Sequence, residues 1–176
     1  MAEKRGYSAL TAALHLVMAV GIFYLFALSW WMLALPWGDA RPFPYQMHKN
    51  VGLTVILLVV IILFDRFRRR PGPLPRSMSG WMRKLAIVDH AALYFLILLA
   101  CLSGYLSSAY SGWGITFWWT VDLPNWGEEN EPLNQFFSDI HIWACWALFA
   151  VLATHIGGAL YHAFRNDGVV RRMLRF

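Results

Sequence analysis

The sequence predicts an all-α integral membrane protein that folds as a four-helix bundle. Of its 176 residues, 59% are hydrophobic and only 14% are charged, whereas a soluble domain carries roughly 25% charged residues. Four long apolar stretches divide the chain, and thirteen of the fifteen Lys and Arg residues fall in the segments at one end of these stretches. The ten Trp are typical of side chains that lie at membrane interfaces.

The four stretches predict transmembrane helices over roughly 9–35, 46–66, 85–109 and 139–164. A helix needs about 20 predominantly apolar residues to cross the hydrocarbon core, and three of the stretches reach that length. The second has 14 uncharged residues between Asn50 and Asp65, so we expect it to span only if its helix begins near Gln46. No signal-peptide cleavage site follows the first stretch, which is therefore expected to be retained. We expect residues 1–176 to form a single transmembrane domain.

The basic residues predict the orientation of the bundle. They precede the first helix, fill the connection between the second and third helices, and follow the fourth helix, whereas only Arg41 and Lys49 lie at the other end. Because Lys and Arg concentrate in cytoplasmic segments, we expect both termini to be cytoplasmic. Charges that flank helix ends line no groove, so we expect membrane lipid as a partner and no nucleic acid.

The connection over residues 110–137 is long, acidic and aromatic, and it contains no basic residue. Its carboxylates and Trp residues are Asp122, Glu128, Glu129, Glu131, Trp113, Trp118, Trp119 and Trp126. This mixture predicts a cap that lies on the outer interface of the membrane.

Four of the six histidines fall at two depths in the predicted bundle. His141 and His155 are 14 positions apart on one helix, which places them on the same face and about 21 Å apart along the axis. His15 lies near the inner end of the first helix and His48 near the outer start of the second. Depth therefore matches His15 with His155 and His48 with His141. Imidazoles from facing helices bind haem iron in helical bundles, so the spacing predicts two bis-histidine haems, one above the other.

Other interpretations of these histidines stay open at this point. Zinc requires further ligands such as Cys or carboxylate, and we expect none in register with either pair. A buried His also forms helix–helix hydrogen bonds, so a cofactor-free membrane anchor is one alternative. A metal-ion or proton transporter is another, although the second and third helices offer few polar residues for a continuous path.

Two further histidines and the inner arginines are candidates for weaker contacts. His90 is expected at the inner start of the third helix, and His162 lies on the same face as His155 but about 10 Å nearer the cytoplasm. Neither has a histidine at the same depth with which to pair. Each is a candidate contact for a haem propionate or a quinone carbonyl, and each is equally well explained as a solvated interfacial residue. Arg69 and Arg70 are candidate propionate partners on the same side.

Short motifs recur along nearly the whole chain in a fixed order: Leu14-His15, His48-Lys49-Asn50-Val51-Gly52, His90-Ala91-Ala92-Leu93-Tyr94, Gly104-Tyr105-Leu106, Ala159-Leu160-Tyr161-His162 and Arg165-Asn166-Asp167-Gly168. In their order and spacing these motifs resemble the bacterial cytochrome b561 family, whose members are four-helix dihaem membrane proteins and include superoxide-oxidising ones. The chain departs from the usual pattern in two places: Leu16 replaces a Trp, and Tyr161 stands where the family often has a second His.

The resemblance implies a haem b protein of the bacterial inner membrane that exchanges electrons with ubiquinone. It implies four axial ligands of two haem b groups: His15 and His155 for the inner iron, and His48 and His141 for the outer iron. His162 and basic residues such as Arg69 and Arg70 would help to hold the quinone. In superoxide-oxidising members, superoxide gives its electron to the haems, which would make this chain a superoxide:ubiquinone oxidoreductase.

The charge expected at the outer face bears on the electron donor. Arg41 and Lys49 are outnumbered there by Asp39, Asp122, Glu128, Glu129, Glu131 and Asp139. Superoxide is an anion, and positive potential accelerates the approach of an anion. The acidic balance therefore keeps a second interpretation open, in which the donor is an unidentified periplasmic one and the chain is the haem b subunit for a dehydrogenase or a hydrogenase-like partner.

Overall fold

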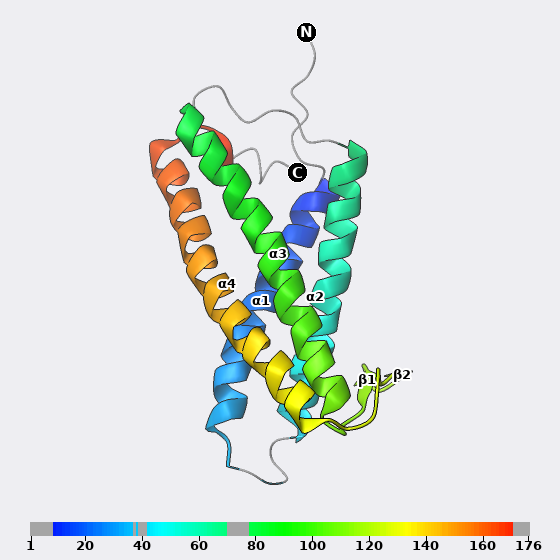
Figure 1. Ribbon diagram of the computed structural model, residues 1–176. Helices are drawn as coiled ribbons and strands as arrows, with labels where there is room; N and C mark the ends of the chain where they lie inside the picture. Colours follow the sequence, from blue (N-terminus) through cyan, green and yellow to red (C-terminus); the bar gives the residue numbers. More distant parts are fainter. Residues whose placement is uncertain (1–8, 37, 39–41, 70–77, 171–176) are drawn as a thin grey trace.

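The computed structural model describes residues 9–36, 38, 42–69 and 78–170. In order, its elements are α1 (Ala9–Ala34), α2 (Pro42–Arg69), α3 (Gly80–Tyr110), β1 (Ile115–Phe117), β2 (Val121–Leu123) and α4 (Glu131–Arg165) (Figure 1). The four helices are all long and apolar enough to cross a membrane. Helices of 26 to 35 residues extend about 39–52 Å, which exceeds the hydrocarbon core of about 30 Å. The predicted fold class is confirmed.

Three helices begin earlier than predicted. The second begins at Pro42, the third at Gly80 and the fourth at Glu131. Proline is well tolerated in a first turn, where its missing N–H has no helical partner to lose. The side chain of Asn130 caps α4 by accepting a hydrogen bond from the backbone N–H of Leu133 at 3.0 Å. The prediction was wrong at these ends because it kept each helix close to its continuous apolar run, whereas α2, α3 and α4 each include further turns before that run.

The helices pack as two antiparallel pairs. α1 packs along α2, α3 packs along α4, and α2 joins the pairs by packing against α3. Between α1 and α4, the ring centroid of Phe149 on α4 lies 5.5 Å from that of Phe26 and 6.3 Å from that of Trp30 on α1. We call the end where α1 begins and α4 finishes the terminal end, and the opposite end, beside β1 and β2, the hairpin end (Figure 1).

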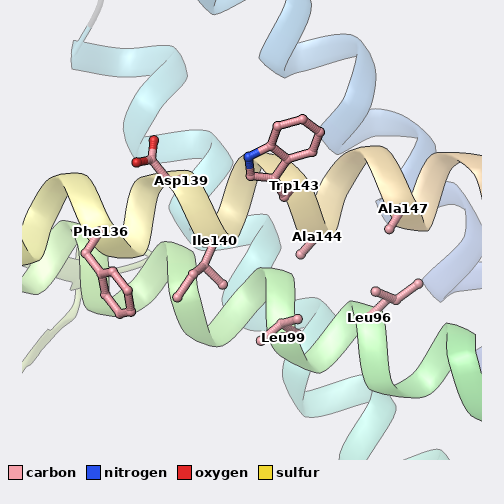
Figure 2. Close-up of a pocket in the computed structure, with 8 residues that line it drawn as sticks. All are labelled: Leu96, Leu99, Phe136, Asp139, Ile140, Trp143, Ala144 and Ala147. Atoms are coloured by element: carbon pink, nitrogen blue, oxygen red, sulfur yellow. The ribbon is translucent and has the colours of Figure 1, made fainter.

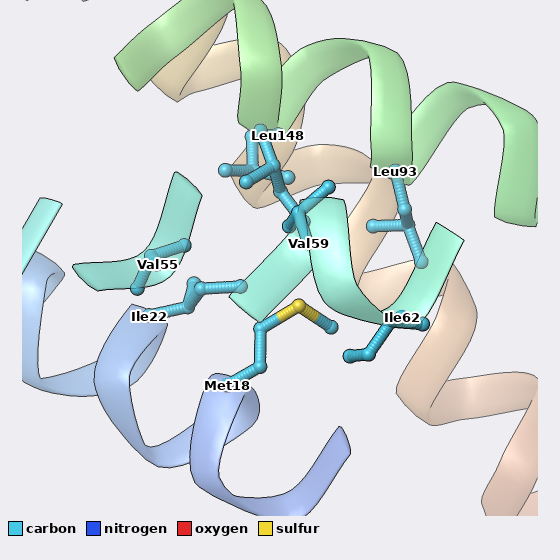
Figure 3. Close-up of a cluster of buried hydrophobic side chains, with 8 residues drawn as sticks. Met18, Ile22, Val55, Val59, Ile62, Leu93 and Leu148 are labelled. Atoms are coloured by element: carbon cyan, nitrogen blue, oxygen red, sulfur yellow. The ribbon is translucent and has the colours of Figure 1, made fainter. Parts of the chain in front are cut away.

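All four helices contribute to a buried apolar core (Figure 3). Val55 and Val59 lie one turn apart on α2 and are 1% and 0% exposed. Leu148 contributes from α4, at the midpoint between the two histidines of that helix. Most of the other large apolar side chains of the helices are exposed, which is typical of a surface that faces lipid.

A two-stranded hairpin covers the hairpin end of α2. β1 and β2 pair antiparallel, and the turn between them places Trp118 and Trp119 at φ values of 44° and 58°, which bulky residues rarely adopt. The side chain of Asn50 accepts a hydrogen bond from the Trp118 backbone N–H at 3.0 Å, and the hydroxyl of Thr54 accepts one from its indole N–H at 3.1 Å. The segment predicted as a cap therefore contains a β-hairpin that is hydrogen-bonded to α2. The apolar pattern of the sequence does not indicate this hairpin.

Candidate functional site

Two pairs of histidines face each other across helix interfaces. At the terminal end, the ring centroids of His15 on α1 and His155 on α4 are 6.3 Å apart. At the hairpin end, those of His48 on α2 and His141 on α4 are 6.0 Å apart. We call them the terminal-end pair and the hairpin-end pair. The structure thus brings together the same four residues, in the same two combinations, that the depth argument matches.

Hydrogen bonds fix the orientation of both histidines of α4. The Nδ1–H of His155 donates to Oδ2 of Asp89 at 2.7 Å, and the Nδ1–H of His141 donates to the backbone carbonyl of Ala100 at 2.7 Å. A proton held at Nδ1 leaves the lone pair on Nε2, which is the usual arrangement in a metal-binding imidazole. Both α4 histidines are therefore prepared as Nε2 ligands.

The surroundings of the hairpin-end pair fit a further group between its rings. The Nδ1 atom of His48 is buried and has no hydrogen-bond partner, although buried nitrogens are nearly always satisfied. A Cβ on Gly52, one turn further along α2, would meet no atom within 4 Å. On the other side, a Cβ on Gly104 would lie 2.9 Å from Nδ1 of His141, so the ring takes its position because residue 104 has no side chain.

The donor chemistry of both pairs fits haem iron. Two imidazoles that bind one metal ion from opposite sides through bonds of about 2 Å have ring centroids roughly 6 Å apart. Both observed separations agree with this value. Each pair offers two nitrogens, the number of axial ligands that a six-coordinate haem takes.

His90 lies beside the terminal-end pair, so the prediction that it begins its helix at the inner side was wrong. α3 starts at Gly80, which carries His90 three turns into the helix, and its ring centroid is 5.2 Å from that of His155. The expectation that no carboxylate lies in register was also wrong. Asp89, His90 and His155 place three possible ligand atoms within 4.8 Å of one another, although zinc would require a further ligand.

The remaining predicted contacts lie at the terminal end. Nδ1 of His162 donates to Oδ2 of Asp167 at 2.6 Å, and this hydrogen bond holds the pKa of Asp167 below its usual range. Arg69 forms an ion pair with Asp65 at 2.7 Å and is 63% exposed. Arg70 lies outside the described residues.

Sequence reasoning missed two residues that contact the histidines or the hairpin. Asp89 carried a signal, because an ionisable residue inside a membrane span is unfavourable and is a functional candidate by default. The predicted start of the third helix at residue 85 placed it near the interface and hid that signal. Asn50, which is 0% exposed, contacts a residue 68 positions away, and no local pattern indicates such a contact.

An apolar groove of about 400 Å³ runs between α3 and α4 near the hairpin end (Figure 2). Leu99 and Ile140 line it, and Asp139 is its one charged lining residue. None of the predicted site residues lines this groove. Its apolar walls fit a lipid chain better than a polar substrate.

Comparison with known proteins confirms the resemblance seen in the motifs. A family model described as prokaryotic cytochrome b561 matches residues 6–176. The chain is 32% identical over 172 residues to cytochrome b561 homolog 2 of Escherichia coli (strain K12), an alignment that covers 96% of this chain and 90% of that protein. The chain therefore belongs to the prokaryotic cytochrome b561 family, as a multi-pass haem b electron-transfer protein of the bacterial inner membrane.

Proposed function

We propose that the chain carries electrons through two haem b groups between a periplasmic donor and ubiquinone. The observation that supports this most is the meeting of four imidazoles at two levels of the bundle. His15 and His155 would hold the terminal-end haem, and His48 and His141 the hairpin-end haem. When bound, haem supplies the one-electron redox chemistry.

The protein's part is to separate the two sites and to keep the space between them dry. Leu148 lies seven residues from both His141 and His155, about 10 Å from each along the helix axis. It belongs to the buried core to which all four helices contribute. This apolar layer excludes water and ions from the space between the two pairs, and the rigid α4 fixes their spacing.

We assign quinone chemistry to the terminal end, which would lie in the cytoplasm because Lys and Arg concentrate in cytoplasmic segments. Reduction of a quinone takes two electrons and two protons, so its carbonyl oxygens need proton donors. The Asp167 carboxylate accepts from Nδ1 of His162 and orients the ring, and in its protonated form this imidazole would donate its Nε2–H to a quinone carbonyl. Arg69 and Arg70 would attract the polar quinone head or a haem propionate.

Superoxide is the first candidate donor at the hairpin end. Two superoxide ions would each give up one electron and leave as dioxygen, and the two electrons with two protons would convert one ubiquinone to ubiquinol. Lys49, which is half-buried, is the only basic residue at this end of the part of the chain that the structure describes. It is the residue that would attract the anion.

The charge of the hairpin end favours a second candidate. In the part of the chain that the structure describes, five exposed carboxylates lie there: Asp122, Glu128, Glu129, Glu131 and Asp139. An acidic surface slows an approaching anion and attracts a cation. A periplasmic dehydrogenase or a hydrogenase-like partner with a basic surface would suit it, and the chain would then be the haem b subunit of that partner.

A reduced-minus-oxidised spectrum with haem quantified per chain tests the proposal. We expect two haem b groups per chain, one in His155→Ala, and two in His162→Ala with slower reduction of ubiquinone. A colourless protein that takes up no added haem would refute the haem proposal, and two haems in His155→Ala would refute the ligand assignment. Rapid mixing with superoxide separates the two donors, because only the first predicts haem reduction without a partner protein.

A further inference from the structure

We propose that Asp89 is a positioning residue for His155 and that its charge makes the terminal-end haem the stronger reductant of the two. The inference rests on the proposed function, in which His155 binds the terminal-end iron. It concerns how two chemically similar bis-histidine sites acquire different redox potentials.

The carboxylate of Asp89 contacts two adjacent residues of α4. Its Oδ2 accepts from Nδ1 of His155 at 2.7 Å, and its Oδ1 lies 3.4 Å from the hydroxyl of Thr154, which donates over a shorter distance of 2.8 Å to the backbone carbonyl of Val151. The side chain is only 13% exposed. Because an unpartnered carboxylate is strongly unfavourable at such a position, the contact between α3 and α4 keeps this group directed at His155.

Asp89 has no Lys or Arg within ion-pair distance in the described part of the chain. Its other neighbour, His90, lies 3.9 Å from Oδ2 and already donates its Nδ1–H to the backbone carbonyl of Ala86 at 2.6 Å. The negative charge therefore acts mainly on the imidazole of His155.

The hairpin-end pair provides the comparison within the same molecule. There, Nδ1 of His141 donates to the backbone carbonyl of Ala100 at the same distance of 2.7 Å, but a carbonyl has no net charge. The two sites thus differ by one negative charge at the group that accepts from Nδ1 of the α4 histidine. A carboxylate bonded to Nδ1 makes the imidazole a stronger donor to the metal, and negative charge favours the more positive, oxidised iron.

The consequence is an ordering of the two potentials. Asp89 lowers the potential of the terminal-end haem relative to the same site without the charge. An electron that reaches this haem is then given up more readily, and in the proposed function its acceptor is the quinone at the same end. The Asp89 carboxylate therefore favours the last electron transfer, from the terminal-end haem to the quinone.

Replacement of Asp89→Asn tests this role, because asparagine keeps the size and an acceptor oxygen but removes the charge. The experiment uses two single-haem backgrounds, His141→Ala with the terminal-end haem and His155→Ala with the hairpin-end haem. In the first, we expect Asp89→Asn to change the ratio of oxidised to reduced haem about tenfold at a fixed potential, a positive shift of about 59 mV for one electron. In the second, we expect no shift.

A matched control and a conservative variant complete the test. Asp122→Asn removes an exposed carboxylate elsewhere in the described part of the chain, one that accepts from Thr116 in the hairpin, and it should leave both potentials unchanged. Asp89→Glu retains the charge and should stay closer to the parent potential than Asp89→Asn. It also serves as the second variant if Asp89→Asn does not accumulate.

The outcomes separate this inference from the proposed function. An unshifted potential in Asp89→Asn, in a chain that keeps its haem, overturns the role of Asp89 alone, as does an equal shift in Asp89→Glu. An equal shift in the His155→Ala background shows a general charge effect and also overturns it. A parent chain with no haem, measured by its spectrum before any titration, refutes the proposed function instead.

Discussion

Gly104 provides a direct test of whether the hairpin-end pair holds a cofactor. In Gly104→Ala, the new Cβ would lie 2.9 Å from Nδ1 and 3.1 Å from Cε1 of His141, whereas ordinary contacts begin at 3.4 Å. The imidazole must therefore retreat by about 0.5 Å. That movement strains the hydrogen bond to the carbonyl of Ala100 and turns the ring away from His48.

The size of the effect follows from three contributions. Crowding in a packed interior is unfavourable by about 1–3 kcal/mol, and loss of the hydrogen bond adds about 0.5–1.5 kcal/mol. Alanine in place of glycine favours the helix by about 1 kcal/mol. The net loss of about 0.5–3.5 kcal/mol corresponds to roughly a 2–300-fold weaker affinity for haem at this site.

The assay is haem per chain after purification, followed by titration of haem into the depleted protein. We expect Gly104→Ala to keep one haem and to bind the second weakly. Gly21→Ala is the control for crowding, because its Cβ would lie 3.2 Å from Val55 and near no histidine, and Gly80→Ala would meet no atom within 4 Å. Both controls should keep two haems. Two tightly bound haems in Gly104→Ala, or an equal loss in Gly21→Ala, would refute the reasoning.

Three further predictions concern the hairpin, the terminal end and the orientation. Asn50→Ala removes the acceptor of the Trp118 backbone N–H, so the hairpin should be destabilised by about 1–3 kcal/mol and the Trp118 amide should exchange faster; unchanged exchange would contradict this. Because the hydrogen bond from His162 lowers the pKa of Asp167, the stabilising contact should be complete above the usual pKa of about 3.9 and lost only as pH falls through the lowered value. The carboxyl ¹³C shift of Asp167 measures this midpoint, and a midpoint at or above the usual value would argue against the contact. Alkaline phosphatase fused to the C-terminus should be inactive and a fluorescent protein there should fluoresce, since basic flanks remain in the cytoplasm; the reverse result would exclude a cytoplasmic C-terminus.

The histidine pairs could be matched from the sequence because helix geometry alone fixes their depth. A rise of 1.5 Å per residue fixes the depth of His141 relative to His155. The depth of a histidine on another helix then depends only on where that helix begins. The uncertain start of the third helix explains the error in the predicted position of His90. The apolar stretch starts at residue 85, the helix starts at Gly80, and the difference moves His90 from an interface to the side of His155.

Contacts made by single side chains across long sequence separations could not be predicted in this way. Asp89 and His155 are 66 positions apart, and Asn50 and Trp118 are 68 apart. Each contact depends on the rotation of one helix or loop against another. Hydropathy fixes the depth of a residue in the membrane, but it leaves that rotation undetermined.

The pairing of the helices has a consequence for how the protein is assembled. α1 with α2 and α3 with α4 form two antiparallel halves, and each half can enter the bilayer as a helical hairpin of its own. In the proposed arrangement, both irons are bound by one histidine from the first half and one from α4, so each haem is a cross-link between the halves. Since metal binding adds directly to the stability of the folded state, a chain made during haem shortage would present two separable halves to membrane proteases. The supply of haem would then set how much of this protein the cell keeps.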